Sequence, residues 1–231
     1  MILHIDTATE FASICLSQND TVIAFEENKE QKNHASFLQP AIQKMMLDIC
    51  CTLCDVDAVS VTNGPGSYTG LRVGLASAKG LCFALNKPLI TLNTLEVMAN
   101  AIVEEKINSK FKIQNSKLLF APMIDARRME VFTAIYNFDL KEVLPMNALI
   151  LNENSFEEEL QKGKIIFSGS GANKFKKICK NENALFSTVQ HSAKNMVDLA
   201  TKKFTKNDFA NLACTSPNYG KEFFTTAKKI F

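Results

Sequence analysis

Hydrophobic positions in the first hundred residues change period several times, and each change marks an expected element. Three short apolar segments come first, separated by Thr9-Glu10 and by Gln18-Asn19-Asp20, and this spacing predicts a meander of three strands. Apolar residues then recur twice at helical spacing, and a short apolar segment follows each helix. The expected order is βββαβαβ, with strands at 2–6, 11–16, 21–25, 56–62 and 89–92 and helices at about 34–54 and 68–85.

Both expected helices carry apolar faces wider than packing on one sheet requires. In the first helix, nine apolar residues between 37 and 53 fall on two adjacent stripes. In the second, only Arg72 and Lys79 are charged, and small residues recur every four positions, at Gly66, Gly70, Gly74 and Ala78. Glycine inside a helix costs about 1 kcal/mol relative to alanine, so this stripe indicates the close approach of another backbone.

Strands and helices continue to alternate after residue 100, without a repeat at the period of a solenoid. The pattern predicts helices at 95–109, 171–180 and 194–207 and strands at 118–124, 131–137 and 164–168. We therefore expect an α/β protein with one lobe at 1–100, a second at 101–210, and a C-terminal segment, 211–231, that returns to the first lobe.

Composition is that of a globular protein. The chain has 231 residues, of which 46% are hydrophobic and 22% charged, and this excludes a disordered or collagen-like chain. The net charge of +2 is unevenly spread, because residues 1–100 carry a net charge of −4 and the remainder +6. We expect a cytoplasmic protein without a signal peptide, since no basic region precedes the first apolar segment and no apolar run reaches about 20 residues.

Seven cysteines, an odd number, are expected to be free thiols of a reducing compartment. Cys51 and Cys54 form a C-x-x-C pair, but no second pair stands at the spacing of a zinc site. Histidines offer no catalytic arrangement either. His4 lies inside the first strand and is expected to be hydrogen-bonded in the core, His34 stands at a helix start, and His191 lies in a polar loop.

Two glycine-containing loops each join a strand to a helix. The first runs from Asn63 to Gly74, and the second is Ser168-Gly-Ser-Gly-Ala172. Backbone N–H groups at such junctions can bind phosphate, but neither loop has the Gly-Lys-Ser/Thr of a P-loop. Tight turns that feed close-packed helices explain the same glycines. Asp6-Thr7, at the end of the first strand, would be either a metal–phosphate ligand pair or a turn.

Arginine is rare in this lysine-rich chain. Only Arg72, Arg127 and Arg128 occur among 26 basic residues. Because a guanidinium recognises carboxylate or phosphate in a planar, two-pronged way, these positions are candidates for anion binding, and salt bridges within the chain are the alternative.

Taken together, these motifs resemble those of the TsaB (YeaZ) family. The resemblance rests on Ile5–Thr9, on Pro88-Leu-Ile90, on Asp125–Val131, on Gly169–Phe175 and on Pro217-Asn-Tyr219, and above all on Gly64-Pro-Gly-Ser-Tyr-Thr-Gly-Leu-Arg72. It implies a two-lobed actin/Hsp70/sugar-kinase-like (ASKHA) fold, with a mixed sheet and helices in each lobe. It also implies a bacterial, cytoplasmic role in threonylcarbamoylation of adenosine 37 in tRNAs that read ANN codons.

The resemblance further implies a subunit without a catalytic site of its own. In that family the catalytic partner is TsaD, a paralogue, and the ATPase TsaE completes the complex. TsaD carries a histidine pair that holds its metal, and here Thr94 and Met98 stand at those positions, so we expect no metal. No cofactor is expected on this chain, and ATP and a metal are expected on the partner subunits. A vestigial nucleotide site would comprise Asp6, Thr7, Gly169 and Gly171.

The two expected helices would then pack against the equivalent pair of TsaD, or against a second copy of this chain in a homodimer. The expected contact residues are Leu38, Ile42, Met45, Met46 and Ile49 in the first helix, and Gly70, Gly74, Ala78 and Leu81 in the second. Lys174, Lys176 and Lys177 are candidates for contact with tRNA. The alternative functions are a small-molecule kinase or ATPase of the same superfold and, less favoured, a metallopeptidase.

Overall fold

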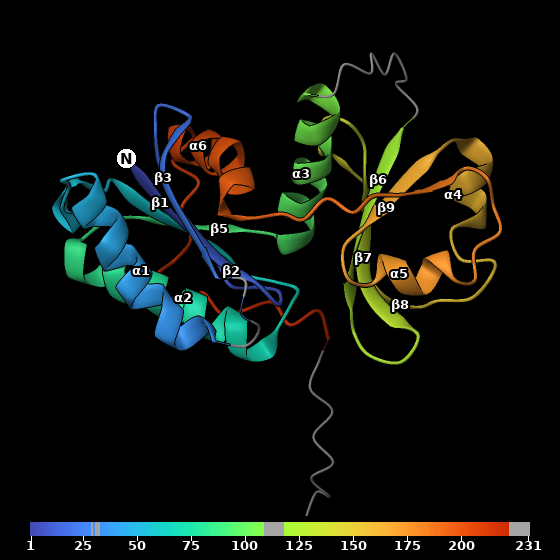
Figure 1. The fold of residues 1–231 in the computed structure, drawn as a ribbon, viewed down its shortest axis with the longest axis horizontal. Coiled ribbons are helices and arrows are strands. Elements are labelled where there is room, and N and C mark those ends of the chain that lie inside the picture. The colour runs from blue at the N-terminus through green and yellow to red at the C-terminus, as the bar shows by residue number, and fades with distance from the viewer. Residues whose placement is uncertain (29, 31–32, 109–117, 222–231) are drawn as a thin grey trace, which may run out of the picture.

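Two lobes, each built on a five-stranded sheet, stand side by side in the computed structural model (Figure 1). The structure describes residues 1–28, 30, 33–108 and 118–221. None of the helices in those ranges has the length and apolar character needed to cross a membrane.

The first sheet joins a meander to two parallel strands. Its order is β3-β2-β1-β4-β5, and β1 lies at the centre, antiparallel to β2 and parallel to β4. Every residue of β1 and β4 is buried, because helices cover both faces of the sheet. The strands are β1 (Ile2–Asp6), β2 (Ala12–Gln18), β3 (Thr21–Asn28), β4 (Ala58–Thr62) and β5 (Leu89–Leu92).

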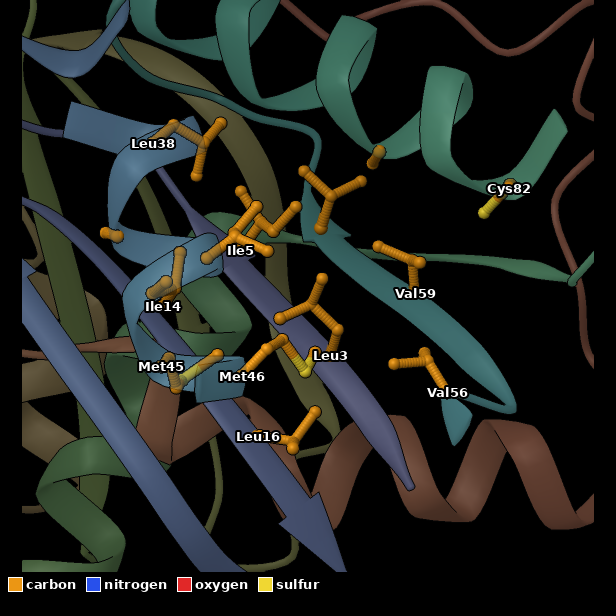
Figure 2. Packing of buried hydrophobic residues seen from close by; sticks show 14 of the residues in the cluster. Leu3, Ile5, Ile14, Leu16, Leu38, Met45, Met46, Val56, Val59 and Cys82 are labelled. Atoms are coloured by element: carbon orange, nitrogen blue, oxygen red, sulfur yellow. The ribbon is translucent and has the colours of Figure 1, made fainter. Parts of the chain in front are cut away.

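Helices α1 (His34–Asp48) and α2 (Tyr68–Leu85) lie together on one face of this sheet (Figure 1). Figure 2 shows their side chains pointing into one core, where Leu38 and Met45 of α1 meet Leu3 and Ile5 of β1. The bounds of α2 are those expected from the sequence, but α1 ends before residue 54. Cys50 adopts a left-handed backbone, with φ of 54°, and this stops the helix. A 3-10 turn, η1 (Leu53–Asp55), follows.

The second sheet repeats the plan of the first. Its order is β10-β9-β6-β7-β8, so the first strand of the lobe is again central, the next two form an antiparallel meander, and the last two are parallel to the first. This duplication confirms the expected two-lobed α/β architecture, with a mixed sheet and helices in each lobe. The strands are β6 (Leu119–Asp125), β7 (Glu130–Tyr136), β8 (Glu142–Ile150), β9 (Ile165–Ser168) and β10 (Ala184–Phe186), and the helices on the outer face are α4 (Glu157–Lys162) and α5 (Ala172–Lys176).

The lobes exchange one helix each. Helix α3 (Thr94–Asn108) follows the first sheet in sequence but packs on β6 and β7 of the second sheet. The 3-10 turn η2 (Ala193–Met196) and α6 (Val197–Thr205) follow the second sheet but cover the free face of the first. The expected lobe boundaries are corrected accordingly. Residue 100 lies inside a helix, and the chain is back in the first lobe from about residue 193 instead of 211.

The C-terminal segment lies along the first lobe. Ala210 pairs with Leu89 at the edge of the first sheet, and the Asn218 N–H donates to the carbonyl of Asn63 at 2.7 Å. Lys79 of α2 donates to the carbonyl oxygen of Thr215 at 3.0 Å. Residues 222–231, the rest of the segment expected to return to this lobe, lie outside the described residues.

Candidate functional site

In the glycine loop of the first lobe, Asn63 to Gly74, backbone atoms of other segments occupy the space beside the glycines. A Cβ at Gly66 would overlap the carbonyl oxygen of Ala8, and one at Gly70 would overlap that of Thr7. Gly64, at a φ of 118°, lies in the same way under the Asn218 carbonyl. These approaches bring carbonyl oxygens, which repel anions, to the glycines. The loop is therefore a tight turn that leads into a close-packed helix. Of the two explanations that the sequence left open, phosphate binding or a tight turn, the structure favours the tight turn.

Asp6, at the end of β1, has both carboxylate oxygens engaged. Its Oδ1 accepts from the Thr62 hydroxyl at 2.8 Å and from the Ala8 N–H at 3.1 Å, and its Oδ2 lies 3.2 Å from Nε2 of His191. Burial alone would raise the pKa of Asp6, but the His191 charge and these hydrogen bonds together hold it below the usual 3.8. Asp6 thus fixes the segment that returns the chain to the first lobe.

Thr7 is also committed to packing. Its hydroxyl donates to the carbonyl of Gly70 at 2.7 Å, and the same hydroxyl fills the place where a Cβ of Gly74 would lie. The small-residue stripe of α2 therefore faces its own strand β1 and allows the helix to approach that strand closely.

In the second lobe, Gly169 and Gly171 lie against methionines. A Cβ at Gly169 would overlap the end of the Met98 side chain, and Gly171 lies against Met123. Met98 and Thr94, which stand at the positions of the expected histidine pair, are buried, and the Thr94 hydroxyl has no hydrogen-bond partner among the described residues. A thioether and one hydroxyl are poor ligands for a divalent ion.

The residues present therefore do not fit a nucleotide with its metal. Asp6 and Thr7 are hydrogen-bonded within the first lobe, and no hydrogen bond among the described residues joins them to Gly169 or Gly171. The described residues also contain no group of three or more His, Cys, Asp or Glu side chains that could hold a metal ion. His191 was not expected at this site, because its loop position gives no signal for the long-range contact with Asp6.

The expected partner-contact residues lie mostly inside the first lobe. Ile49 and Leu81 are half-buried, and the other seven are buried, namely Leu38, Ile42, Met45 and Met46 of α1 and Gly70, Gly74 and Ala78 of α2. The apolar face of α1 is wide because it packs on the sheet and on α2 at once. The seven buried residues thus pack within the lobe, and the expected contact of these positions with another protein stays a prediction.

A second face of α1 and α2 points away from the sheet. On α2 it carries small exposed residues every four positions, at Ala76, Gly80 and Ala84, and a Cβ at Gly80 would meet nothing within 4 Å. Phe83 beside them is 82% exposed, and Leu47 of α1 is 69% exposed. We call these five residues the outer helix face. Small residues allow a partner helix to approach closely, and two large apolar side chains gain by being covered.

The comparisons with known proteins agree with this architecture. Residues 26–229 match the family model of TsaD, described as tRNA N6-adenosine threonylcarbamoyltransferase. YeaZ from Pseudomonas aeruginosa superposes with a TM-score of 0.79 at 22% identity, over 94% of this chain and 98% of that one, and so shares the fold.

Two curated relatives from different bacteria carry the same name. The tRNA threonylcarbamoyladenosine biosynthesis protein TsaB of Bacillus subtilis (strain 168) is 33% identical over 153 residues, which are 65% of this chain. The chain spans only 62% of the length of that relative. The TsaB protein of Buchnera aphidicola subsp. Baizongia pistaciae is 30% identical over 182 residues, covering 76% of this chain and 77% of that protein. These matches show that the chain belongs to the TsaB (YeaZ) family, within the wider TsaD-like group.

Proposed function

We propose that this protein is a non-catalytic subunit that binds a TsaD-like catalytic subunit through the outer helix face. The reaction served is threonylcarbamoylation of adenosine 37 in tRNAs that read ANN codons, in the bacterial cytoplasm. The names of the Bacillus and Buchnera relatives support the pathway, because both are described as tRNA threonylcarbamoyladenosine biosynthesis proteins.

The observation that carries this proposal is the outer helix face itself. Phe83 is 82% exposed next to the small residues Ala76, Gly80 and Ala84 on one side of a helix. A helix with apolar residues on both sides is built to be covered twice. The sheet covers one side of α2, and a second pair of helices would cover the other. In the absence of the TsaD-like subunit, the same face can pair with a second copy of the chain.

Packing around Asp6 supports a role without catalysis. A kinase or ATPase needs a carboxylate and a phosphate cradle that are open to the nucleotide. Here Asp6 faces His191, and carbonyl oxygens and methionines lie against the glycines. The proposed subunit requires no cofactor of its own, and ATP and a metal belong to its TsaD-like and TsaE-like partners. A metallopeptidase would need metal ligands where Thr94 and Met98 stand.

Reconstitution tests the proposal. The chain is mixed with the TsaD-like and TsaE-like proteins of its own organism, the adenylate-forming enzyme, threonine, bicarbonate, ATP and tRNA, and modified adenosine is measured by mass spectrometry. We expect modification only when the chain is present, and loss of modification with Phe83→Asp. Full modification without the chain would overturn the proposed role, and ATP hydrolysis by the pure chain would favour the kinase or ATPase.

A further inference from the structure

All three arginines of the chain are exposed, and none has an ion-pair partner among the described residues. Arg72 lies near the N-terminus of α2, whereas Arg127 and Arg128 lie in the turn between β6 and β7 of the other lobe. The salt bridges that the sequence left as an alternative are therefore not formed within the described part of the chain. A continuous series of contacts nevertheless links Arg72 to the turn that holds Arg127 and Arg128.

The first part of that series is aromatic. The Arg72 guanidinium carbon lies 4.8 Å from the centre of the Tyr68 ring, and the Tyr219 ring lies 4.8 Å from Tyr68 on a plane tilted by 34°. Tyr68 is 44% exposed and Tyr219 half-buried. Tyr219 belongs to the C-terminal segment, which emerges between the first-lobe helices and the second sheet (Figure 1).

The second part crosses to the other lobe. Gly220 lies directly against the ring of Phe132, and Lys221 forms an ion pair with Glu130 of β7. The Glu130 N–H in turn donates to the Arg127 carbonyl at 3.0 Å. The aromatic pair and the arginine turn are therefore neighbours at one end of the seam between the lobes.

The arginine turn is held in an uncommon backbone conformation. Arg127 and Arg128 both have positive φ, at 71° and 50°, and left-handed geometry is unfavourable for such residues. The Arg127 N–H donates to the Asp125 carboxylate at 2.6 Å, and the Ala126 N–H donates to the Glu130 carbonyl at 3.0 Å. These bonds fix the backbone and leave both guanidinium groups outside.

Charge in this region is positive. The carboxylates of Asp125 and Glu130 are each paired with a lysine, Lys174 and Lys221 respectively. The three arginines then add three positive charges that these carboxylates do not neutralise. We call Tyr68, Arg72, Arg127, Arg128 and Tyr219 the arginine–tyrosine surface.

We propose that the arginine–tyrosine surface binds RNA, with guanidinium groups on phosphates and the tyrosine rings against unpaired bases. Cationic side chains interleaved with aromatic rings are the chemistry by which proteins hold single-stranded segments. A purely acidic peptide would use the charges but not the rings. The inference rests on the proposed function for the identity of the RNA, a tRNA substrate. It differs from the expectation for Lys174, which is paired with Asp125.

Binding of a fluorescein-labelled anticodon stem–loop RNA tests the proposal. Fluorescence anisotropy is recorded across a salt series for the full chain alone and for its complex with the TsaD-like subunit. Arg72→Gln/Arg127→Gln/Arg128→Gln should bind at least about tenfold more weakly and lower the salt slope by about 2 to 3, since each lost phosphate contact removes roughly one. The matched control, Lys162→Gln/Lys164→Gln/Lys206→Gln, removes the same charge from exposed lysines elsewhere.

Two further variants separate the elements of the surface. Tyr219→Leu should weaken RNA binding about 5- to 100-fold through lost stacking, without changing the salt slope. Arg127→Gln/Arg128→Gln leaves α2 intact and should weaken RNA binding while the partner subunit still co-elutes. Thermal denaturation checks that each variant is folded.

Three results would overturn the inference. The first is RNA binding by the triple arginine variant complex within twofold of wild type. The second is an equal loss in the lysine control. The third is displacement of the RNA by polyglutamate as readily as by unlabelled RNA, which would indicate an acidic-peptide surface. None of these affects co-elution with the partner or the need for the chain in modification, so failure here leaves the proposed function standing.

Discussion

Phe83→Asp should weaken binding of the partner and leave the stability of the chain nearly unchanged. Ile42→Asp should instead destabilise the fold. Phe83 is 82% exposed on the outer helix face, whereas Ile42 is 3% exposed in the core between α1 and the first sheet. Ile42 lies on α1 and Phe83 on α2, the two helices that we propose to contact the partner. If burial decides the outcome, Phe83→Asp removes the partner contact, and Ile42→Asp removes the fold that presents it.

The magnitudes follow from that exposure. Ile42→Asp loses about 2 to 3 kcal/mol of apolar burial, and burying the new polar group without partners adds about 1 to 3 kcal/mol. The total of about 3 to 6 kcal/mol is most of the stability of a domain at the lower end of the usual range of about 5–15 kcal/mol. Phe83→Asp should change the free energy of unfolding by no more than about 0.5 kcal/mol. At a central interface position it should cost 2 kcal/mol or more of binding, roughly a 30-fold rise in Kd.

Urea denaturation of each variant and calorimetric titration with the TsaD-like subunit give the two quantities. Ile150→Asp is the matched control, because Ile150 is 67% exposed on β8 of the second lobe, away from the outer helix face. Ile150→Asp should change neither the free energy of unfolding nor the affinity for the TsaD-like subunit. Wild-type affinity in Phe83→Asp, or a folded Ile42→Asp with an unchanged midpoint, would refute the assignment of inner and outer faces.

The remaining predictions concern buried contacts. Gly74→Ala should destabilise the chain by 1 kcal/mol or more, because its Cβ would overlap the Thr7 hydroxyl, whereas Gly80→Ala, with open space around it, should stabilise the isolated chain by up to about 1 kcal/mol. Equal melting temperatures for the two would contradict the packing described. Burial lowers the pKa of His4 to about 3, and its two ring nitrogens each lie 2.7 Å from a serine hydroxyl. Only the unfolded chain takes up this proton as pH falls below about 6.5. Stability should therefore fall from there toward pH 3, by up to about 1.4 kcal/mol per unit. His4→Gln should show a shallower fall in denaturation midpoint, and an identical pH profile would remove His4 as its cause. Asp6→Asn should loosen the segment at 187–192, since it removes the charge facing His191, and faster amide exchange there would show it. Unchanged exchange would mean that other contacts hold the segment.

Local sequence was enough for the elements that depend on short-range signals. The bounds of α2 follow from Ser67, whose side chain accepts from the Gly70 N–H, and from Asn86, which ends the helix in a left-handed conformation. The meander of β1 to β3 follows from apolar segments separated by polar turns. His4, expected in a hydrogen-bonded core position, is found there. The motifs around Gly64 and Arg72 were sufficient to indicate the family.

Contacts between distant segments could not be derived in this way. The apolar stripes of α1 did not reveal which side faces the sheet, because two adjacent stripes look alike until α2 is placed beside them. Strand β8 was not predicted, because exposed apolar residues such as Val143 and Ile150 weaken its alternation of apolar and polar positions. The exchange of α3 and α6 between lobes depends on which sheet face remains uncovered.

The sequence by itself therefore determined the order and type of most elements of the first lobe, since period and turn residues act over a few positions. Only the tertiary structure decided what each polar candidate does. Asp6 faces His191, 185 positions later in the chain, and contacts of the C-terminal segment link Tyr68, beside Arg72, to Glu130, beside the turn of Arg127. Such contacts are set by the packing of whole sheets and helices, where burial of apolar surface outweighs any local preference.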